Sequence, residues 1–185
     1  MILEPAYNFR APDTCLFGLN FLWRTRNPKL THWTGEVTEA GASNFFIVWK
    51  TREGKTQLVT APLGDKIILD GVTRRSILQL ARERLSVSTI QEGLEPLEIV
   101  ERKFTMEDVA EPVKEGRVIE AFAAGTAYFV CPVSVINYRN QDLQIPMKNG
   151  ETGEYAGLIK TWLMNIMYGR EQHEWGVVVE EKETL

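Results

Sequence analysis

Residues 44–60 read NFFIVWKTREGKTQLVT, and this stretch decides the fold class. Aromatic and β-branched side chains fill residues 44–50, which is typical of a strand. Residues 51–54 then contain a glycine and charged side chains, as in a tight turn, and Thr56–Thr60 resumes the strand pattern. The stretch therefore predicts a β-hairpin, and the rest of the chain is arranged around it.

Downstream of the hairpin the apolar spacing changes to that of a helix, since Ile77, Leu78, Ala81 and Leu85 recur at helical intervals. A second helix is expected from Thr105, a residue type that often caps helices, through about Lys114. The elements expected after the hairpin are, in order, a strand at 66–69, a helix at 73–85, a loop at 86–96, a strand at 97–104, a helix at 105–114, a segment at 117–123 open to either state, a strand region at 127–138 broken at Pro132, a loop at 140–153, a helix at 154–168 and a strand or tail at 175–179.

Strands and helices are mixed without a regular strand-helix-strand alternation, so the sequence predicts an α+β fold. Residues 1–35 have weak periodicity, and we expect an irregular segment with one strand at 17–23. The expected domain covers residues 36–180, and residues 181–185 form a tail.

Composition excludes several classes of protein. Hydrophobic residues make up 44% of the chain and charged residues 25%, which is ordinary for a globular protein. A net charge of −4 gives no reason to expect binding to nucleic acid or to an acidic membrane surface. No apolar run is long enough to predict a transmembrane helix.

The metal-binding residue types are too few and too scattered for a predicted metal site. Cys15 and Cys131 lie far apart in the sequence, as do His32 and His173. We therefore expect neither a disulfide framework nor a zinc site, and a reducing compartment fits best. Serine-hydrolase, Walker-loop and dinucleotide motifs are also missing from the sequence.

Three segments of small residues could carry chemistry. Residues 37–44 place Glu39 beside glycine and alanine, residues 69–75 form a glycine turn before a helix, and residues 123–127 place Thr126 between small residues. The first amides of a helix can hold a phosphate, and small residues let a ligand approach the backbone. An exposed turn glutamate, a helix end in water and a plain tight turn explain the same segments without a ligand.

Two charged pairs have simpler explanations. Arg74 and Arg75 are adjacent and cannot share a helix face, so we expect at least one of them in solvent. Glu107 and Asp108 fall in the first turn of the helix at 105–114, where acids interact favourably with the helix dipole.

Taken in order, four motifs resemble the class IV pyridoxal-phosphate aminotransferases, and most closely their branched-chain group. They are VTEAGASN at 37–44, APLGDKIILDGVTRRSIL at 61–78, GTAYFVCPV at 125–133 and YGREQHEW at 168–175. The resemblance covers about residues 36–180. It implies the C-terminal large domain of that fold, with mixed strands in a pseudo-barrel flanked by helices, and pyridoxal 5'-phosphate as the cofactor.

The resemblance also implies a cofactor site. Glu39 matches the carboxylate that pairs with the pyridinium nitrogen, which strengthens the ring as an electron sink. Val72 and Thr73 match the ligands of the cofactor phosphate at a helix end, and Thr126 matches a further phosphate contact.

Substrate-binding positions follow in the same way. Thr126 and Ala127 match residues whose backbone amides bind the substrate carboxylate, and Gly41 matches a glycine that lets the substrate lie close. Cys131 matches the second cysteine of a redox pair found in some relatives, but Tyr128 stands where the first would be. The thiol switch is therefore not expected here.

One departure concerns the lysine that family members use as covalent anchor and proton-transferring base. Nothing in residues 1–35 matches its motif, and the one upstream lysine, Lys29, lies only ten residues before Glu39. No catalytic residue is assigned, and we expect weak cofactor binding and little turnover by this chain alone.

The resemblance implies amino-group transfer between leucine, isoleucine or valine, or a related amino acid, and 2-oxoglutarate. It also implies a homodimer or a dimer with a full-length relative. From the cysteine usage and the N-terminal residues we expect a cytoplasmic protein, with a mitochondrial location as the alternative. Two other hypotheses stay open: a non-catalytic remnant that binds a full-length aminotransferase, and a class IV enzyme for a D-amino acid or aminodeoxychorismate.

Overall fold

The computed structural model describes residues 9–10, 35–41, 43–64, 67–86, 94–126, 129–148, 152–177 and 179. Nine strands and three helices are assigned within these residues. In chain order they are β1 (Phe9–Arg10), β2 (Glu39–Ala40), β3 (Ser43–Lys50), β4 (Thr56–Thr60), α1 (Val72–Arg84), β5 (Glu98–Glu101), α2 (Met106–Lys114), β6 (Val118–Gly125), β7 (Phe129–Pro132), β8 (Val135–Tyr138), β9 (Gln141–Gln144) and α3 (Glu154–Met167).

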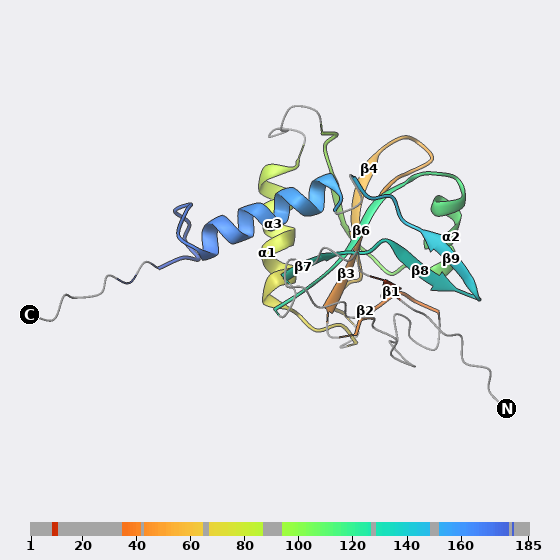
Figure 1. The fold of residues 1–185 in the computed structure, drawn as a ribbon, viewed down its shortest axis with the longest axis horizontal. Helices are drawn as coiled ribbons and strands as arrows, with labels where there is room; N and C mark the ends of the chain where they lie inside the picture. The colour runs from red at the N-terminus through yellow and green to blue at the C-terminus, as the bar shows by residue number, and fades with distance from the viewer. Residues whose placement is uncertain are drawn as a thin grey trace, which may run out of the picture.

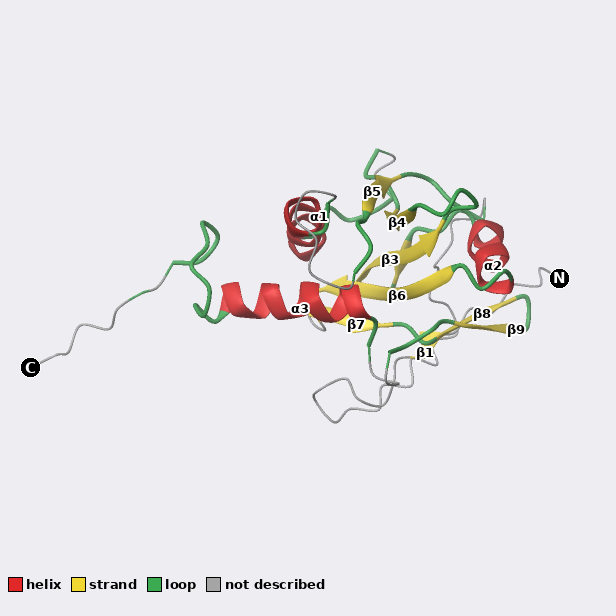
Figure 2. Ribbon diagram, turned by 90° about the horizontal axis from the view of Figure 1, so that it is seen from above, coloured by secondary structure: helices red, strands yellow, loops and turns green. Residues whose placement is uncertain are grey.

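A six-stranded sheet forms the centre of the domain, with β5, β4, β3, β6 and β7 side by side and β2 paired to β3 (Figure 1). All pairs are antiparallel except β4 with β5. A smaller sheet of β1, β8 and β9 continues beyond β7 (Figure 2). This mixed architecture confirms the predicted α+β class.

Alternation along β3 divides the core between the two faces of the sheet. Phe46 and Val48 point toward α1 and α3, whereas Phe45, Ile47 and Trp49 point toward α2 and the small sheet. All five side chains are buried because both faces are covered. The rings of Phe46 and Phe122 stack at 5.0 Å and tie β3 to β6 under the two helices.

The predicted hairpin and the three predicted helices are confirmed. Residues 51–54 form the turn between β3 and β4, and α1, α2 and α3 begin and end within a few residues of their predicted bounds. Thr105 caps α2 through a capping box, since its hydroxyl accepts the Asp108 N–H while the Asp108 carboxylate accepts the Thr105 N–H.

Several strand predictions are wrong in detail. Residues 67–69 form no strand, because they belong to the connection that leads into α1, and β5 is shorter than the predicted 97–104. The predicted loop at 140–153 contains β9, whose two exposed ends, Gln141 and Gln144, resemble a loop in sequence. The segment at 117–123, left open above, is strand β6.

The break at Pro132 is confirmed and separates two sheets. β7 ends at Pro132 and pairs with β6, whereas β8 begins at Val135 and pairs with β9 and β1. Phe9–Arg10 add a short strand to the segment predicted to be irregular, and the strand predicted at 17–23 lies outside the described residues. Residues 175–177 form no strand. Among the described helices, none is long and apolar enough to cross a membrane.

Candidate functional site

Glu39 begins β2, where its side chain is held by two hydrogen bonds. Its Oε1 accepts the backbone N–H of Leu69 at 2.7 Å and the Nδ2 amide of Asn44 at 3.0 Å. The Asn44 amide also donates to the carbonyl of Leu69 at 3.0 Å. The acid is therefore half-buried and joined to the segment that enters α1, which excludes the simple exposed turn glutamate.

Strand register brings the third small-residue segment to the same end of the sheet. Glu39 pairs with Asn44, and Asn44 pairs with Ala124 on β6. Thr126 follows two residues after Ala124 and is exposed just beyond the end of β6. Ala127 lies outside the described residues.

The N-terminus of α1 completes this end of the sheet. Gly71 is its N-cap, no side chain caps the helix, and its first turn carries no acid. The amides of Val72 and Thr73 lie in the first turn, where a helix offers no backbone acceptor. Leu69, which donates to Glu39, is only two residues before Gly71. Glu39 and the helix start thus lie together.

The other two described helices begin differently. α2 is capped by Thr105 and Asp108. α3 follows Gly153, and the Glu120 carboxylate accepts the amides of Tyr155 at 3.1 Å and Ala156 at 2.7 Å. Among the described helices, α1 is therefore the one whose start holds neither a capping hydroxyl nor a carboxylate.

Gly41 lies in the turn between β2 and β3 with a φ of 63°. This left-handed conformation favours glycine in a tight hairpin turn. The turn alone therefore requires a small residue here, next to Glu39. The same exposed position keeps the backbone accessible from solvent.

Two polar residues that lie next to helix starts were not identified from the sequence. Asn44 stands at the start of an aromatic run and was assigned only to the strand, although it is the partner of Glu39. Glu120 is an acid inside an apolar strand, 2% exposed. Its burial raises the pKa of its carboxyl to about 7, against the two amide hydrogen bonds that lower it. The sequence did contain a sign of this role of Glu120, since it is an acidic residue within an apolar segment.

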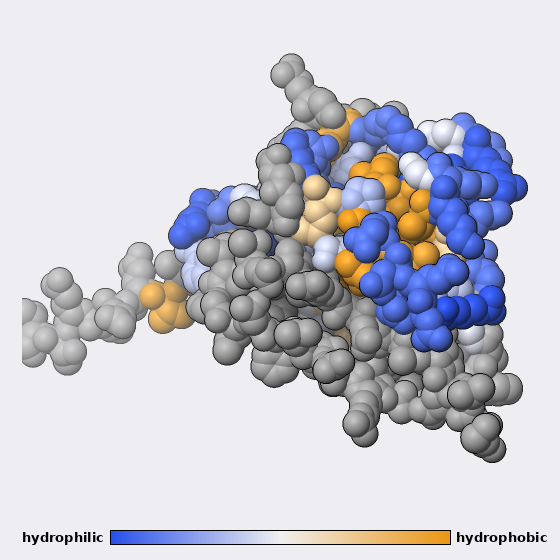
Figure 3. Space-filling view, turned by 45° about the vertical axis from the view of Figure 1, so that its right-hand side comes forward, coloured by the Kyte–Doolittle hydropathy of each residue, from blue (hydrophilic) through white to orange (hydrophobic). Residues whose placement is uncertain are grey.

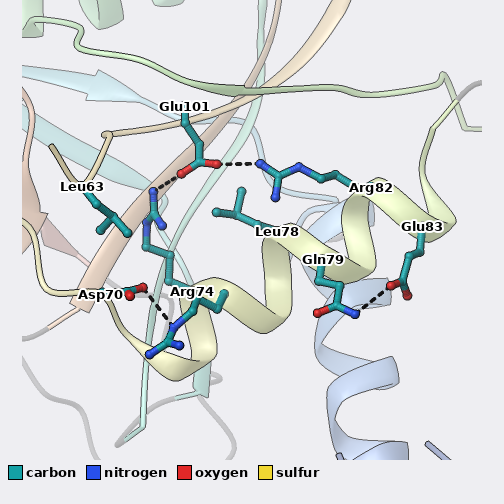
Figure 4. A pocket seen from close by; sticks show the side chains of 9 residues that line it. Leu63, Asp70, Arg74, Leu78, Gln79, Arg82, Glu83 and Glu101 are labelled. Atoms are coloured by element: carbon teal, nitrogen blue, oxygen red, sulfur yellow. Dashed lines mark hydrogen bonds and ion pairs between the residues drawn. The ribbon is translucent and has the colours of Figure 1, made fainter. Parts of the chain in front are cut away.

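The outer side of α1 carries a separate hollow of about 520 Å³ (Figure 4). Glu101 lies there between two arginines, with its Oε2 at 2.6 Å from Arg74 Nη2 and its Oε1 at 2.6 Å from Arg82 Nη2. Arg74 is 1% exposed and also donates to the carbonyl of Ala61 at 2.9 Å, whereas the Arg75 side chain is largely in solvent. The expectation that at least one of the pair is solvated is confirmed.

Apolar side chains lie open on the surface near the site and at the far end of α3. Leu69 is 70% and Val72 is 62% exposed, beside Glu39 and the start of α1. Met167, Tyr168 and Val177 are similarly exposed after or at the end of α3. A further hydrophobic area reaches the surface on the side of the molecule that comes forward in Figure 3.

No metal site is indicated in the described part of the chain. No group of three or more potential metal ligands gathers there. Cys131 lies in β7, is half-buried, and its Sγ donates weakly to the carbonyl of Pro132 at 3.8 Å.

Comparison with known families matches residues 30–136 to the model of amino-transferase class IV. The chain belongs to the class IV aminotransferase family. The matched residues include Glu39, the start of α1 and Thr126, so all three small-residue segments lie in the family domain.

Relatives of this class IV aminotransferase chain are named branched-chain-amino-acid aminotransferases. The protein from Monosiga brevicollis is 44% identical over 144 residues, which is 78% of this chain and 34% of the relative. The mitochondrial protein of Schizosaccharomyces pombe is 43% identical over 143 residues, 76% of this chain and 32% of the relative. The cytosolic protein of Saccharomyces cerevisiae is 44% identical over 150 residues, 78% of this chain and 37% of the relative.

Solved structures of the class IV family support the fold. The Escherichia coli branched-chain amino acid aminotransferase matches with a TM-score of 0.54 and 24% identity, over 78% of this chain and 39% of that chain. The chain spans about a third of the length of the curated relatives it matches.

Proposed function

We propose that this chain carries the pyridinium and phosphate ends of a pyridoxal 5'-phosphate site in a branched-chain amino-acid aminotransferase. The observation that carries the proposal is the 2.7 Å hydrogen bond from the Leu69 N–H to Glu39 Oε1. It holds a carboxylate next to an uncapped helix N-terminus. Pyridoxal phosphate needs these two groups, an acid for its ring nitrogen and an anion site for its phosphate.

The donor set at this end of the sheet fits the cofactor. Within the described residues both hydrogen bonds of the Glu39 side chain go to Oε1, and no described residue donates to Oε2. Glu39 would pair with the ring nitrogen. The amides of Val72 and Thr73, the Thr73 hydroxyl and Thr126 would bind the phosphate. When bound, the cofactor supplies an electron sink for breaking bonds at the substrate Cα.

The same end of the sheet would take the substrate carboxylate. We propose Thr126 and Ala127 as the source of backbone amides and Gly41 as the residue that leaves space for the substrate. The exposed Thr126 and the left-handed turn at Gly41 support this assignment.

The reaction proposed for the whole protein is transfer of the amino group between leucine, isoleucine or valine, or a related amino acid, and 2-oxoglutarate. Three relatives that are 43–44% identical carry the name of this activity. We expect little turnover by the 185-residue chain alone, because no lysine in it matches the covalent anchor. We propose a cytoplasmic location, with mitochondria as the alternative, and a domain that extends over residues 36–180.

Binding of pyridoxal phosphate to the 185-residue chain tests this proposal, measured by calorimetry or by quenching of tryptophan fluorescence. Thr73→Ala removes a hydrogen bond to a charged ligand and should weaken binding about tenfold. Inorganic phosphate should compete for the same site. Thr161→Ala is the matched control, since Thr161 is an exposed helical threonine that donates to the carbonyl of Gly157. Equal affinities of wild type and Thr73→Ala would contradict the phosphate assignment.

The exposed apolar residues favour a second candidate function, that of a non-catalytic partner of a full-length aminotransferase. Leu69, Val72 and Met167 would be covered by such a partner. Co-expression with a full-length branched-chain aminotransferase, followed by size-exclusion chromatography, distinguishes the two. A stable mixed dimer without gain in activity supports the second candidate, and a chain that stays alone argues against it.

A further inference from the structure

Asn44 makes two hydrogen bonds and lies close to Gly71, although it is part of a strand of mostly apolar residues. Its Nδ2 lies 3.0 Å from Glu39 Oε1 and 3.0 Å from the carbonyl of Leu69. Its Oδ1 lies 2.6 Å from the point where a Cβ on Gly71 would be. The side chain is thus surrounded by the acid, the connection into α1 and the helix cap.

The chemistry of these contacts requires a carboxamide. Its two amide hydrogens can serve Glu39 and Leu69, and aspartate has no donor for either. Asn44 is only 5% exposed, so its hydrogen bonds are largely protected from water. Gly71, with an ordinary φ of −67°, leaves room for Oδ1 because it has no side chain.

Among the described residues, the contacts that hold the Glu39 side chain both go to one carboxylate oxygen. Asn44 Nδ2 and the Leu69 N–H both donate to Oε1. Two donors to Oε1 restrain the carboxylate, and no described residue donates to Oε2, which can therefore serve a ligand. The Gly71 N–H donates to the carbonyl of Leu69 at 2.8 Å, so the hydrogen-bond network of Glu39 and Asn44 extends to the N-cap of α1.

We propose that Asn44 is a positioning residue that orients the Glu39 carboxylate and fixes it relative to the N-terminus of α1. The proposal rests on the proposed role of Glu39 as partner of the cofactor ring nitrogen. Asn44 would hold the ring-binding acid and the phosphate-binding turn in one rigid unit. The cofactor then meets both groups at the spacing that its own length requires.

Two variants disturb the contacts of Asn44, one by changing Asn44 itself and the other by changing its neighbour Gly71. Asn44→Asp keeps the shape of the side chain and removes its donor. Gly71→Ala leaves Asn44 in the sequence but places a methyl group 2.6 Å from its Oδ1, which forces it to move. Gly64→Ala is the matched control, since no atom lies within 4 Å of the added Cβ. The Gly71 route keeps the test valid if Asn44→Asp fails to fold.

The first readout needs no ligand and is hydrogen exchange at the Leu69 amide, measured by NMR on the full chain. Both variants should exchange there about tenfold faster than wild type, because the Glu39 acceptor is no longer held in place. The Val109 amide in α2 and all amides of Gly64→Ala should keep wild-type rates. Wild-type protection of Leu69 in both variants would overturn the proposal.

The second readout compares pyridoxal phosphate with its 1-deaza analogue, which lacks the ring nitrogen. Wild type should prefer pyridoxal phosphate, and the preference should fall to about one in both variants while affinity for inorganic phosphate is kept. An unchanged preference in the variants would count against positioning by Asn44. A wild type without any preference would instead refute the role of Glu39, and Leu69 exchange alone would then decide whether Asn44 positions it.

Discussion

The backbone N–H of Ala156 lies 2.7 Å from Glu120 Oε1, so an acid buried in β6 accepts hydrogen bonds at the start of α3. Glu120 is 2% exposed, and the amide of Tyr155 donates to its other oxygen at 3.1 Å. The negative carboxylate and the positive end of the helix dipole attract each other, which partly offsets the cost of burial.

Glu120 should make the stability of the protein depend on pH. Burial raises the pKa of its carboxyl from 4.5 in the unfolded chain to about 7 in the folded protein. The folded state then binds more protons between these values, so its stability falls as pH rises from about 4.5 to 7. Relative to Glu120→Gln, wild type should lose up to about 3 kcal/mol across this range.

Urea unfolding at several pH values measures this difference. The nearby charge of Glu154 also raises the pKa of Glu120, but less than burial does. Glu154→Gln should therefore keep most of the pH dependence. If wild type and Glu120→Gln follow parallel curves, Glu120 does not titrate in this range.

Glu101 should matter far more for stability than its exposed neighbours. It neutralises Arg74, which is 1% exposed and whose Nε has no hydrogen-bond partner in the described structure. Glu101→Gln leaves a buried charge uncompensated and should cost about 3 kcal/mol. Arg82→Ala removes a half-exposed partner of Glu101 and should cost less than about 1 kcal/mol. Adding Arg74→Met to Glu101→Gln should recover most of the loss in chemical denaturation.

The ion pairs of Glu101 with Arg74 and Arg82 should also make the stability of the protein depend on pH in the acid range. Burial raises the pKa of Glu101, but the hydrogen bonds from Arg74 and Arg82 outweigh it and the net pKa is lowered. Glu101 thus contributes stability above its unfolded pKa of about 4.5, and this contribution is lost as pH falls through the lowered value. If the stability of Glu101→Gln fell in acid as much as that of wild type, this contribution of Glu101 would be refuted.

Thr105→Ala should destabilise the protein by about 1 kcal/mol, because it removes the hydroxyl that accepts the Asp108 N–H at 3.2 Å. Thermal unfolding by circular dichroism measures the change. Thr161→Ala is again the control, and its effect should be no more than about 0.5 kcal/mol. Equal losses in the two variants would mean that the capping box adds nothing.

Arg84 should hold the segment after α3 in place. Its guanidinium bonds to Glu171 at 2.5 Å and lies 5.2 Å from the centre of the Trp162 ring. Arg84→Ala should speed proteolysis after residue 168, and Arg84→Lys should restore little, because the planar fork and the ring stacking are specific to arginine. Limited digestion with chymotrypsin, analysed by gel electrophoresis, measures the rate of this cleavage. Full rescue by lysine would show that charge alone suffices.

Local patterns in the sequence were enough to predict the elements with strong periodicity. The hairpin of β3 and β4 follows from its aromatic run and turn, and α1 follows from Ile77, Leu78 and Ala81. β9 was missed because two of its four residues are glutamines facing solvent. Of the strand expected at 66–69, the described residues 67–69 form no strand, and the Leu69 N–H donates to the Glu39 side chain instead of to a neighbouring strand.

The site was only half predictable for a similar reason. Glu39, Val72 and Thr73 stand in motifs, so the sequence could name them together with Thr126. The contact between Glu39 and Leu69 spans 30 residues and depends on the register between β2 and β3. Asn44 and Glu120 act through tertiary contacts with helix starts, and no local pattern reveals such contacts.

Gly71 and Gly153 precede helices with unremarkable φ values of −67° and −75°, yet each faces a polar side chain from the sheet. A Cβ would meet Asn44 at 2.6 Å in the first case and Glu120 at 2.0 Å in the second. Gly54 differs, since its φ is +84° and its surroundings are open. In a library of all single substitutions, Gly54 should therefore accept asparagine and Gly71 should accept alanine only by displacing the Asn44 side chain, while Gly153 should accept no other residue. Such a pattern of tolerance would identify the positions where polar side chains of the sheet contact the starts of α1 and α3. It would do so without a ligand and without a structure determination.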